Sequence, residues 1–149
     1  SAEVALKWPN DIIVSGRKIC GILCETRAGL TAIGMGINVN RSVWPDDLAH
    51  RAVSLRQLAG REFDLDEVAT AVARELSVWV ETYYEQGFGP VRQEFLQHGL
   101  LDEYQVFDDG DRPCSIIDLT PDGHLVIESG GNRRTLVSES ISIGWEDNL

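Results

Sequence analysis

Residues 6–25, LKWPNDIIVSGRKICGILCE, set charged and amide side chains among apolar residues that are typical of β-strands. The formal net charge of the chain is −11, yet this stretch holds the cations Lys7, Arg17 and Lys18 close to Asn10 and Asp11. Polar groups near a core cost free energy unless a protein group or a ligand partners them. The stretch therefore predicts short strands with polar groups whose partners are either protein or ligand.

Turn signals divide residues 4–40 into a meander of short strands. Pro9 has no N–H and biases the residue before it away from helix, so it interrupts the first strand. A turn at Ser15-Gly16 precedes a longer strand at Arg17–Glu25, in which Ile22 and both cysteines share one face. A further strand is expected at Leu30–Val39, where the glycines taken alone favour a bulge.

Helices are expected between residues 54 and 97. A short helix at Ser54–Ala59 precedes a long helix that Asp64 caps, with Glu67 completing a capping box. The long helix ends at Gly87, and a third helix follows at about Pro90–Gln97. Apolar residues recur at helical spacing along the long helix and predict a stripe that covers a sheet: Val68, Ala69, Val72, Leu76, Trp79, Val80 and Tyr83.

Short strands separated by turn signals return after Glu103. Runs at 115–119, 125–128 and 134–137 are divided by glycine-containing turns, and strands of this length and spacing indicate a small β-barrel. The predicted fold class is α+β: part of a mixed sheet covered by helices, followed by the barrel.

Composition argues against several classes of partner. Nucleic-acid binding needs basic residues that neutralise phosphates, whereas 24 acidic residues exceed 13 lysines and arginines here, so no nucleic-acid partner is expected. No apolar run approaches the roughly 20 residues that span a bilayer, and no signal-peptide pattern is visible, so we expect a cytoplasmic protein without a membrane partner. Three cysteines are an odd number, which predicts buried, reduced thiols.

The polar stretch at residues 6–25 has two interpretations. Lysines beside an aspartate and an asparagine suit phosphate chemistry, in which the lysines offset phosphate charge and the carboxylate holds magnesium. Alternatively, Lys7 and Lys18 are surface residues whose stems cover apolar neighbours.

Three other motifs are weaker. Gly34–Asn40, GMGINVN, lets a ligand or a strand approach the backbone, but it lacks the third glycine and the following helix of a dinucleotide-binding loop. The acidic cluster Asp108–Asp111 lacks EF-hand spacing and predicts a solvated hairpin turn. Trp44, in an expected loop at 41–50, either stacks on a base or packs on the sheet.

KWPND, GRK, GIL followed by Glu25, and GMGINVN occur here in an order and spacing that resemble the biotin protein ligases. The following helices and the C-terminal strands, which end near ISIGW, extend the resemblance over nearly the whole chain. It implies a class II synthetase-like catalytic domain, of which residues 1–101 are the C-terminal portion, and an SH3-like domain at 102–149. It also implies that biotin and ATP give biotinyl-AMP and pyrophosphate, and that a lysine of a biotin carboxyl carrier domain then accepts the biotin.

The resemblance also assigns roles to the quoted residues. It makes Lys18, Asp11 and Lys7 catalytic, with Lys18 contacting the biotin carboxylate and the adenylate phosphate. Asp11 would also orient the incoming amine and, with Asn10, bind Mg²⁺. Biotin would contact Lys18, Gly21, Gly34, Met35 and Gly36, and ATP or the adenylate would contact Lys7, Asn10, Arg17, Asn38 and Trp44.

The chain departs from the family in one respect. The N-terminal half of the family's catalytic domain, with its glycine- and arginine-rich loop over biotin, has no counterpart in these residues. We therefore expect the isolated chain to be incomplete as a ligase, and to pair either with that half or as a homodimer through an exposed sheet edge. The alternative functions are a non-catalytic module that binds a nucleotide or a carrier domain, and a lipoate-transferring relative of the same fold.

Overall fold

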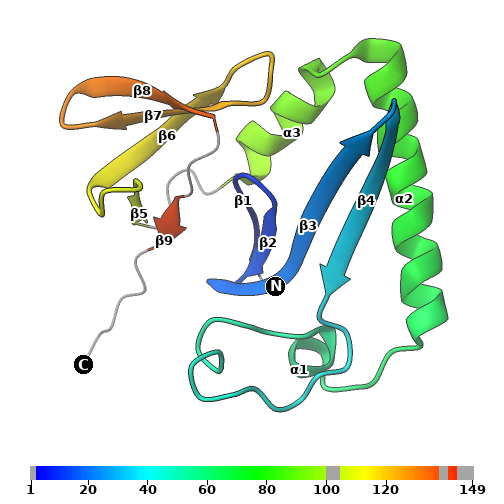
Figure 1. The fold of residues 1–149 in the computed structure, drawn as a ribbon. Coiled ribbons are helices and arrows are strands. Elements are labelled where there is room, and N and C mark those ends of the chain that lie inside the picture. The colour runs from blue at the N-terminus through cyan, green and yellow to red at the C-terminus, as the bar shows by residue number, and fades with distance from the viewer. Residues whose placement is uncertain (1–2, 100–104, 138–140, 144–149) are drawn as a thin grey trace. The chain divides into compact units, whose positions relative to one another are not determined.

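The computed structural model describes residues 3–99, 105–137 and 141–143 and shows an α+β fold (Figure 1). The chain divides into two compact units, the first made of residues 1–5 and 10–74 and the second of residues 6–9 and 75–149. The expected domain boundary between residues 101 and 102 lies outside the described residues. No helix in the described part of the chain is both long and apolar enough to cross a bilayer.

Four strands form the first sheet in chain order: β1 (Val4–Lys7), β2 (Asp11–Val14), β3 (Arg17–Arg27) and β4 (Leu30–Ile37). The β2–β3 and β3–β4 pairs are antiparallel, which confirms the expected meander. The β3–β4 register is regular throughout, so the bulge expected in the glycine-containing strand is wrong. The register shifts between β2 and β3 instead, where Ile12 pairs with Cys20 but Ile13 pairs with Lys18.

Both hairpin turns of this sheet are two-residue turns with positive φ at each position. Ser15 and Gly16 have φ of 46° and 75°, and Ala28 and Gly29 have φ of 52° and 79°. Two-residue turns of this hand match the twist of the flanking strands, and glycine at the second position adopts the conformation without steric cost. The turns thereby define where β3 begins and ends (blue to cyan in Figure 1).

The core of the first unit lies on one face of this sheet. Val14, Ile19, Cys20 and Val53 are buried there, and a ring of partly buried apolar residues packs around them: Ile12, Ile22, Met35, Ile37 and Leu55. Cys20 and Cys114 are buried as expected, but Cys24 is exposed, so the prediction of three buried thiols is wrong for that residue. Cys24 pairs with Ile33 nearer the hairpin tip, and Ile33 is itself 39% exposed.

The helices are α1 (Leu55–Ala59), α2 (Leu65–Gln86) and α3 (Gly89–His98). Ser54 caps α1 in a complete capping box with Gln57. Asp64 Oδ1 accepts from the backbone N–H groups of Asp66 and Glu67, which confirms the predicted N-cap of α2. Gly87, with φ of 73°, ends α2 as expected.

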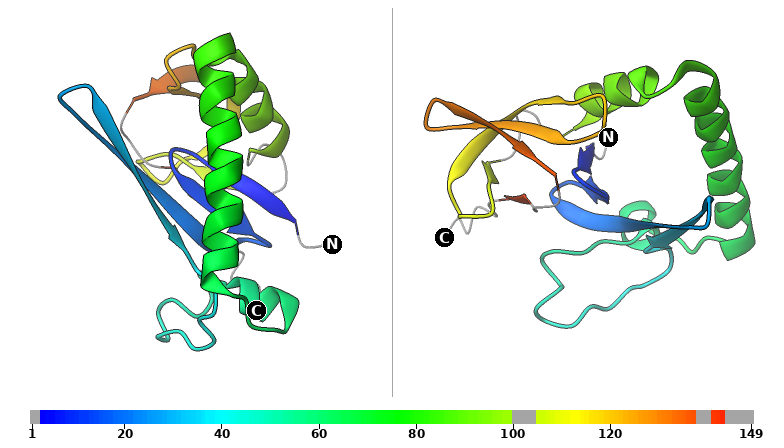
Figure 2. Two further views of the ribbon diagram at one scale, coloured as in Figure 1. Left: turned by 90° about the vertical axis from the view of Figure 1, so that its right-hand side faces the viewer. Right: turned by 45° about the horizontal axis from the view of Figure 1, so that its top comes forward.

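The apolar stripe of α2 forms but is not covered within the described residues. No residue of α2 is buried, and Trp79 and Tyr83 are 39% and 51% exposed. Helical spacing alone places side chains on one face of a helix, and it does not specify what covers that face. Figure 2 shows α2 as one long, continuous helix.

Five short strands form the second sheet in the order β8-β7-β6-β5-β9. They are β5 (Val106–Phe107), β6 (Pro113–Leu119), β7 (Leu125–Ser129), β8 (Asn132–Leu136) and β9 (Ser142–Ile143), and every adjacent pair is antiparallel. Leu125, Ile127 and Leu136 are fully buried in this sheet, whose curvature is visible in Figure 2. β8 and β9 are the outer strands of this order, and an SH3-like barrel stays a prediction.

The acidic turn at Asp108–Asp111 is a hairpin turn, but it is not solvated at Asp108. That side chain is fully buried and accepts from Arg112 Nη2 at 2.8 Å and Arg134 Nη1 at 3.0 Å. The backbone N–H groups of Gly110 and Arg112 also donate to it. The sequence could not show this arrangement because Arg134 comes from β8, far along the chain.

Candidate active site

Lys18 and Asp11 meet across the β2–β3 hairpin. Their Nζ and Oδ1 atoms are 2.6 Å apart, and the Lys18 side chain is 48% exposed while that of Asp11 is 15% exposed. The register shift in β3 allows this pairing, because it places Lys18 and Gly21 on the same sheet face although three positions separate them. The ion pair therefore lies at the protein surface with one exposed cation, as an anion-binding site requires.

Gly21 leaves the space that this ion pair occupies. It lies directly opposite Asp11 in the β2–β3 register. A Cβ atom at Gly21 would lie 3.0 Å from Lys18 Nζ and 3.5 Å from Asp11 Oδ1. A side chain at this position would therefore crowd the Lys18 ammonium and shift it from its present place beside Asp11.

Gly34 and Gly36 extend the bare surface onto β4. Gly36 pairs with Gly21 and Gly34 pairs with Leu23, so these glycines share the face that carries Lys18 and Asp11. A Cβ at either glycine would meet only a backbone oxygen at 3.7 Å, an ordinary contact, so the fold itself does not require glycine there. Three glycines on adjacent strands leave a floor of exposed backbone that a flat ligand can approach.

The backbone of Lys18 is held by the chain after the 41–50 loop rather than by β2 alone. Its N–H donates to the carbonyl of Arg51, and its carbonyl accepts from Val53 N and from Asn38 Nδ2. These bonds fix the residue at the register shift, so the ammonium group projects from a rigid point. No pattern in the sequence predicts this contact of Lys18 with residues 51–53, because an isolated parallel bridge has no local signature.

Asn10 extends the pairing of β2 with β3. Its carbonyl accepts from Ile22 N and its side-chain Nδ2 donates to the Ile22 carbonyl, both at 2.8 Å. The side-chain nitrogen thus donates to β3, whereas the side-chain oxygen Oδ1 can bind a cation or accept a hydrogen bond. Arg17 begins β3 opposite Val14, half-buried.

Lys7 and Met35 occupy different places in the fold from the other predicted site residues. Lys7 is the half-buried last residue of β1 and belongs to the second unit, whereas Lys18, Asp11 and the three glycines belong to the first. Met35 pairs with Ile22 and packs against the hydrophobic core, so its side chain lies on the opposite face from Gly34 and Gly36. A ligand contact of either residue stays a prediction.

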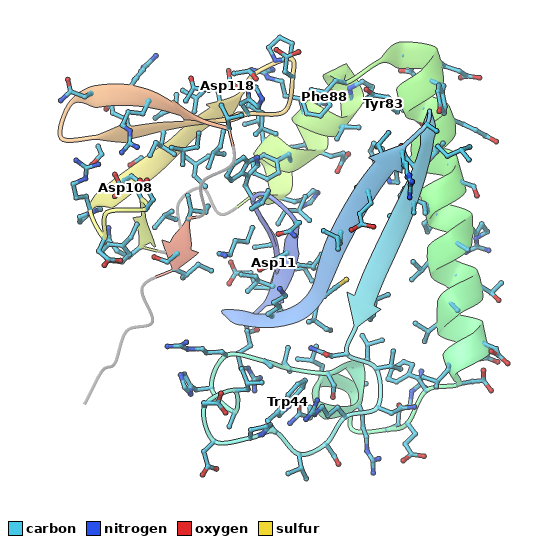
Figure 3. All side chains as sticks on the ribbon, viewed as in Figure 1. Asp11, Trp44, Tyr83, Phe88, Asp108 and Asp118 are labelled. Atoms are coloured by element: carbon cyan, nitrogen blue, oxygen red, sulfur yellow. The ribbon has the colours of Figure 1, made fainter. Side chains whose placement is uncertain are left out.

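The loop that follows β4 is fixed to α1 by Trp44. Trp44 Nε1 donates to Gln57 Oε1 at 2.8 Å, and the guanidinium of Arg41 lies 4.8 Å from the centre of the indole ring. Ser54 Oγ donates to the Arg41 carbonyl at 2.5 Å. The ring is half-buried against this network, and Figure 3 shows it beside α1.

Cys20 borders the site but is not an activated nucleophile. Burial raises the pKa of its thiol, and this effect exceeds the opposing influence of the Lys18 charge. The thiol is therefore neutral near pH 7, and a neutral thiol is a poor nucleophile. The chemistry of this site rests on the ammonium, the carboxylate and the amides.

Several known proteins are similar to this chain. The model of the biotin/lipoate A/B protein ligase family matches residues 1–49, which contain KWPND, GRK and GMGINVN. The biotin–[acetyl-CoA-carboxylase] ligase of Paracoccus denitrificans is 29% identical over 147 residues, which cover 85% of this chain and 61% of that protein. The bifunctional ligase/repressor BirA of Bacillus subtilis is 37% identical over 97 residues, which cover 60% of this chain and 30% of that protein. The chain is therefore similar to biotin protein ligases both in these motifs and over most of its length.

Solved structures of biotin protein ligases share the fold. The apo enzyme of Aquifex aeolicus superposes with a TM-score of 0.84 at 26% identity, over 95% of this chain and 65% of that one. The same enzyme in complex with biotin and ATP gives a TM-score of 0.80 over 95% of this chain. The chain thus spans less than two thirds of the length of these relatives.

Proposed function

We propose that the protein activates biotin as biotinyl-AMP and transfers it to a lysine of a biotin carboxyl carrier domain. The observation that carries this proposal is the Lys18 ammonium, held 2.6 Å from Asp11 beside the strand face that Gly21, Gly34 and Gly36 leave bare. An exposed cation beside a backbone surface without side chains suits a ring system that carries a carboxylate at the end of an extended chain. The names of the relatives and the Aquifex aeolicus complex with biotin and ATP support the same ligands.

In the first step, a carboxylate oxygen of biotin attacks the α-phosphorus of ATP. A bond forms between that oxygen and phosphorus, the bond to the β-phosphate oxygen breaks, and pyrophosphate leaves with the electron pair. Two anions approach each other in this step, so a fixed cation between them lowers the barrier. Lys18 would bind both the carboxylate and the α-phosphate, and Lys7 and Arg17 would contact the phosphates.

In the second step, the amine of the carrier lysine attacks the acyl carbon of biotinyl-AMP. An amide bond forms, the acyl–oxygen bond breaks, and AMP leaves while the amine gives up a proton. Asp11 would orient the incoming ammonium group and accept its proton, because its carboxylate lies at the same point of the site as Lys18. The Lys18 charge then stabilises the departing phosphate.

The adenine would lie near Asn38 and Trp44. The Asn38 Nδ2 atom is committed to the Lys18 carbonyl, which leaves Oδ1 to accept from an amino group such as that of adenine. Trp44 is held at α1 by Gln57 and offers a ring surface for stacking. The adenine assignment thus rests on the orientation of the Asn38 side chain, which its hydrogen bond to the Lys18 carbonyl sets.

Magnesium fits the residues at this site. Mg²⁺ is usually bound through one or two carboxylates together with substrate phosphates. Asp11, the first residue of β2, supplies a carboxylate, and the preceding residue, Asn10, supplies the amide oxygen Oδ1. Among the described residues, no group of three or more acidic, histidine or cysteine side chains could hold a metal by itself. Mg²⁺ held by Asp11 and Asn10 would offset charge on the ATP phosphates.

A lipoate-transferring activity is the second candidate, because the matching family model includes lipoate ligases as well as biotin ligases. The two activities share the adenylate chemistry and differ in the acid that lies on the glycine floor. Competition separates them: lipoyl-AMP should displace a biotinyl-AMP analogue only if the floor accepts the lipoyl chain.

The test is biotin-dependent release of pyrophosphate by the full-length protein, followed by transfer of labelled biotin to a purified carrier domain. Lys18→Ala should lower the rate of biotinyl-AMP formation about 100-fold or more, because it removes the cation that would bind both the biotin carboxylate and the α-phosphate in the transition state. The matched control is Arg27→Ala, which removes a cation from the exposed end of the same strand and should leave the rate unchanged. Wild-type protein that releases no pyrophosphate with biotin would contradict the proposal.

A further inference from the structure

Gln57 joins the short helix α1 to the loop that carries Trp44. Its side-chain oxygen Oε1 accepts from Trp44 Nε1 at 2.8 Å and from the backbone N–H of Ser54 at 3.2 Å. An amide oxygen has two lone pairs, and these two donors engage both of them. The same oxygen atom thus completes the capping box of α1 and holds the indole ring.

Ser54 holds the beginning of the same loop. Its fully buried side chain accepts from Gln57 N at 3.2 Å and donates to the Arg41 carbonyl at 2.5 Å. Arg41 Nε in turn donates to the Val43 carbonyl, and its guanidinium lies 4.8 Å from the centre of the Trp44 ring, where the face of the ring attracts a cation. The ring is therefore held through its N–H, through its face and through the backbone that precedes it.

α1 is itself fixed to the residues that follow β4. The backbone N–H groups of Leu55 and Arg56 donate to the carbonyls of residues 38 and 39. The Asn40 side chain accepts from Phe63 N at 2.9 Å and donates to the Phe63 carbonyl at 2.7 Å. The chain before the helix and the chain after it are thus both attached to residues 38–40, so α1 is a rigid support for Gln57.

The residues after β4 also connect this support to the ion pair. Asn38 Nδ2 donates to the Lys18 carbonyl at 3.3 Å, and Lys18 Nζ lies 2.6 Å from Asp11 Oδ1. All of these residues belong to the first unit of the chain, so their geometry is set within that unit. A base on the Trp44 ring and a phosphate at Lys18 would be held by one connected set of hydrogen bonds.

The exposure of the loop explains why the ring needs an anchor. Trp44 is half-buried, whereas every other residue from 41 to 50 is exposed. A side chain that must be ordered when a ligand binds lowers the affinity, and a side chain that the protein already holds avoids this loss. The indole has a single hydrogen-bond donor, and Gln57 is its acceptor.

We infer that Gln57 is a positioning residue for the nucleotide, which holds the Trp44 ring in place to stack on the base of ATP. The inference rests on the proposed function, in which the base lies at Trp44. Gln57 does not touch the reacting atoms and acts through the indole ring. Its loss should therefore weaken the binding of ATP and leave the chemical step unchanged.

The experiment is a double-mutant cycle in the full-length protein, and its readout is the dissociation constant of the non-hydrolysable analogue adenylyl imidodiphosphate. Gln57→Ala removes the acceptor, whereas Trp44→Phe keeps an aromatic ring and removes the N–H. Gln57→Glu keeps an oxygen for both donors, because a capping box uses either residue. Gln93→Ala, which removes an exposed glutamine of α3, is the matched control.

Gln57→Ala should weaken binding of the analogue about fivefold, the value of one hydrogen bond. Gln57→Glu should recover most of the affinity, and the control should not change it. In the Trp44→Phe background, Gln57→Ala should have no further effect, because the hydrogen bond is already absent. The Trp44 indole N–H, identified in NMR spectra by its loss in Trp44→Phe, should exchange faster with water in Gln57→Ala.

Biotin-dependent pyrophosphate release at saturating ATP, measured in parallel, should keep its kcat in Gln57→Ala. An equal loss of affinity on Gln57→Ala in the wild-type and Trp44→Phe backgrounds would show that Gln57 acts only through the cap of α1, and would overturn the inference. Wild-type protein that binds the analogue no more tightly than Gln57→Ala would also overturn it. The expected binding pattern in a protein that forms no biotinyl-AMP would support the role of Gln57 and refute the proposed function.

Discussion

Gly21 shows how a single missing methyl group shapes the site. Gly21 is not in a left-handed conformation, so glycine is not needed there for the backbone. What matters is the space beside it, because a Cβ atom at this position would lie only 3.0 Å from Lys18 Nζ. The neighbour that must move is the end of a flexible side chain. Filling this space would therefore move the Lys18 side chain and leave the backbone fold unchanged.

We predict that Gly21→Ala leaves the melting temperature within about 2 °C of wild type and lowers biotinyl-AMP formation about tenfold or more. The shifted Lys18 ammonium would no longer bridge the carboxylate and the α-phosphate. Thermal unfolding and pyrophosphate release measure the two effects.

Gly34→Ala is the informative comparison, because its Cβ would make only an ordinary 3.7 Å contact and would leave Lys18 in place. If the glycine floor binds the ligand, this variant raises the KM for biotin and changes kcat little. A Gly21→Ala protein with wild-type kcat would show that the Lys18–Asp11 geometry is not needed for the reaction.

At the scale of elements, the turn between β5 and β6 is organised by one buried carboxylate. The side-chain hydrogen bond from Arg112 lowers the pKa of Asp108 from 3.8 to about 2, assisted by backbone N–H groups of Gly110 and Arg112. Because the folded-state pKa lies below the unfolded-state value, ionised Asp108 stabilises the folded state above about pH 4. This contribution is lost as the pH falls from about 4 to 2.

We predict that Asp108→Asn lowers the melting temperature at pH 7 and flattens the loss of stability between pH 4 and 2. The amide cannot neutralise Arg112, which comes just before β6, and Arg134 of β8, both of which contact the buried carboxylate. Melting curves across this pH range, recorded by circular dichroism, measure both effects.

Asp109→Asn is the matched control for this turn. Asp109 is 43% exposed and contacts Arg134 Nη2 at 3.3 Å, so solvent screens its ion pair and its replacement should change stability little. Equal effects of the two substitutions would contradict a special role for the buried carboxylate.

At the scale of the whole molecule, ligand binding should be coupled to stability. A ligand that binds only the folded state adds about 2.7 kcal/mol at a free concentration one hundred times its Kd. We predict that biotin with ATP and Mg²⁺ raises the melting temperature of the full-length protein by about 5 °C or more. Lys18→Ala should abolish the increase, and Arg27→Ala should preserve it; a shift that survives Lys18→Ala would place the ligand elsewhere.

The apolar face of α2 is also a property of the whole molecule. Trp79 and Tyr83 recur at helical spacing, as the sequence predicts, but the described residues leave both exposed. Periodicity determines which side chains share a helix face, because it depends only on the backbone repeat. What covers that face depends on contacts that have no local pattern.

Patterns of neighbouring residues were enough to predict most of the helices and strands and the residues of the candidate site. The turn at Ser15-Gly16, the Asp64 cap and the Gly87 stop act within a few residues, so their patterns are visible in the sequence. KWPND, GRK and GMGINVN likewise pointed to Lys18, Asp11 and the glycines of the candidate site, and to the similarity with biotin protein ligases. The tertiary structure alone decided how these residues meet: the register shift beside Lys18, the burial of Asp108 by Arg134, and the bond from Trp8 to Gly123. Each depends on pairing between distant segments, and such pairing is set by the packing of the whole chain rather than by neighbouring residues.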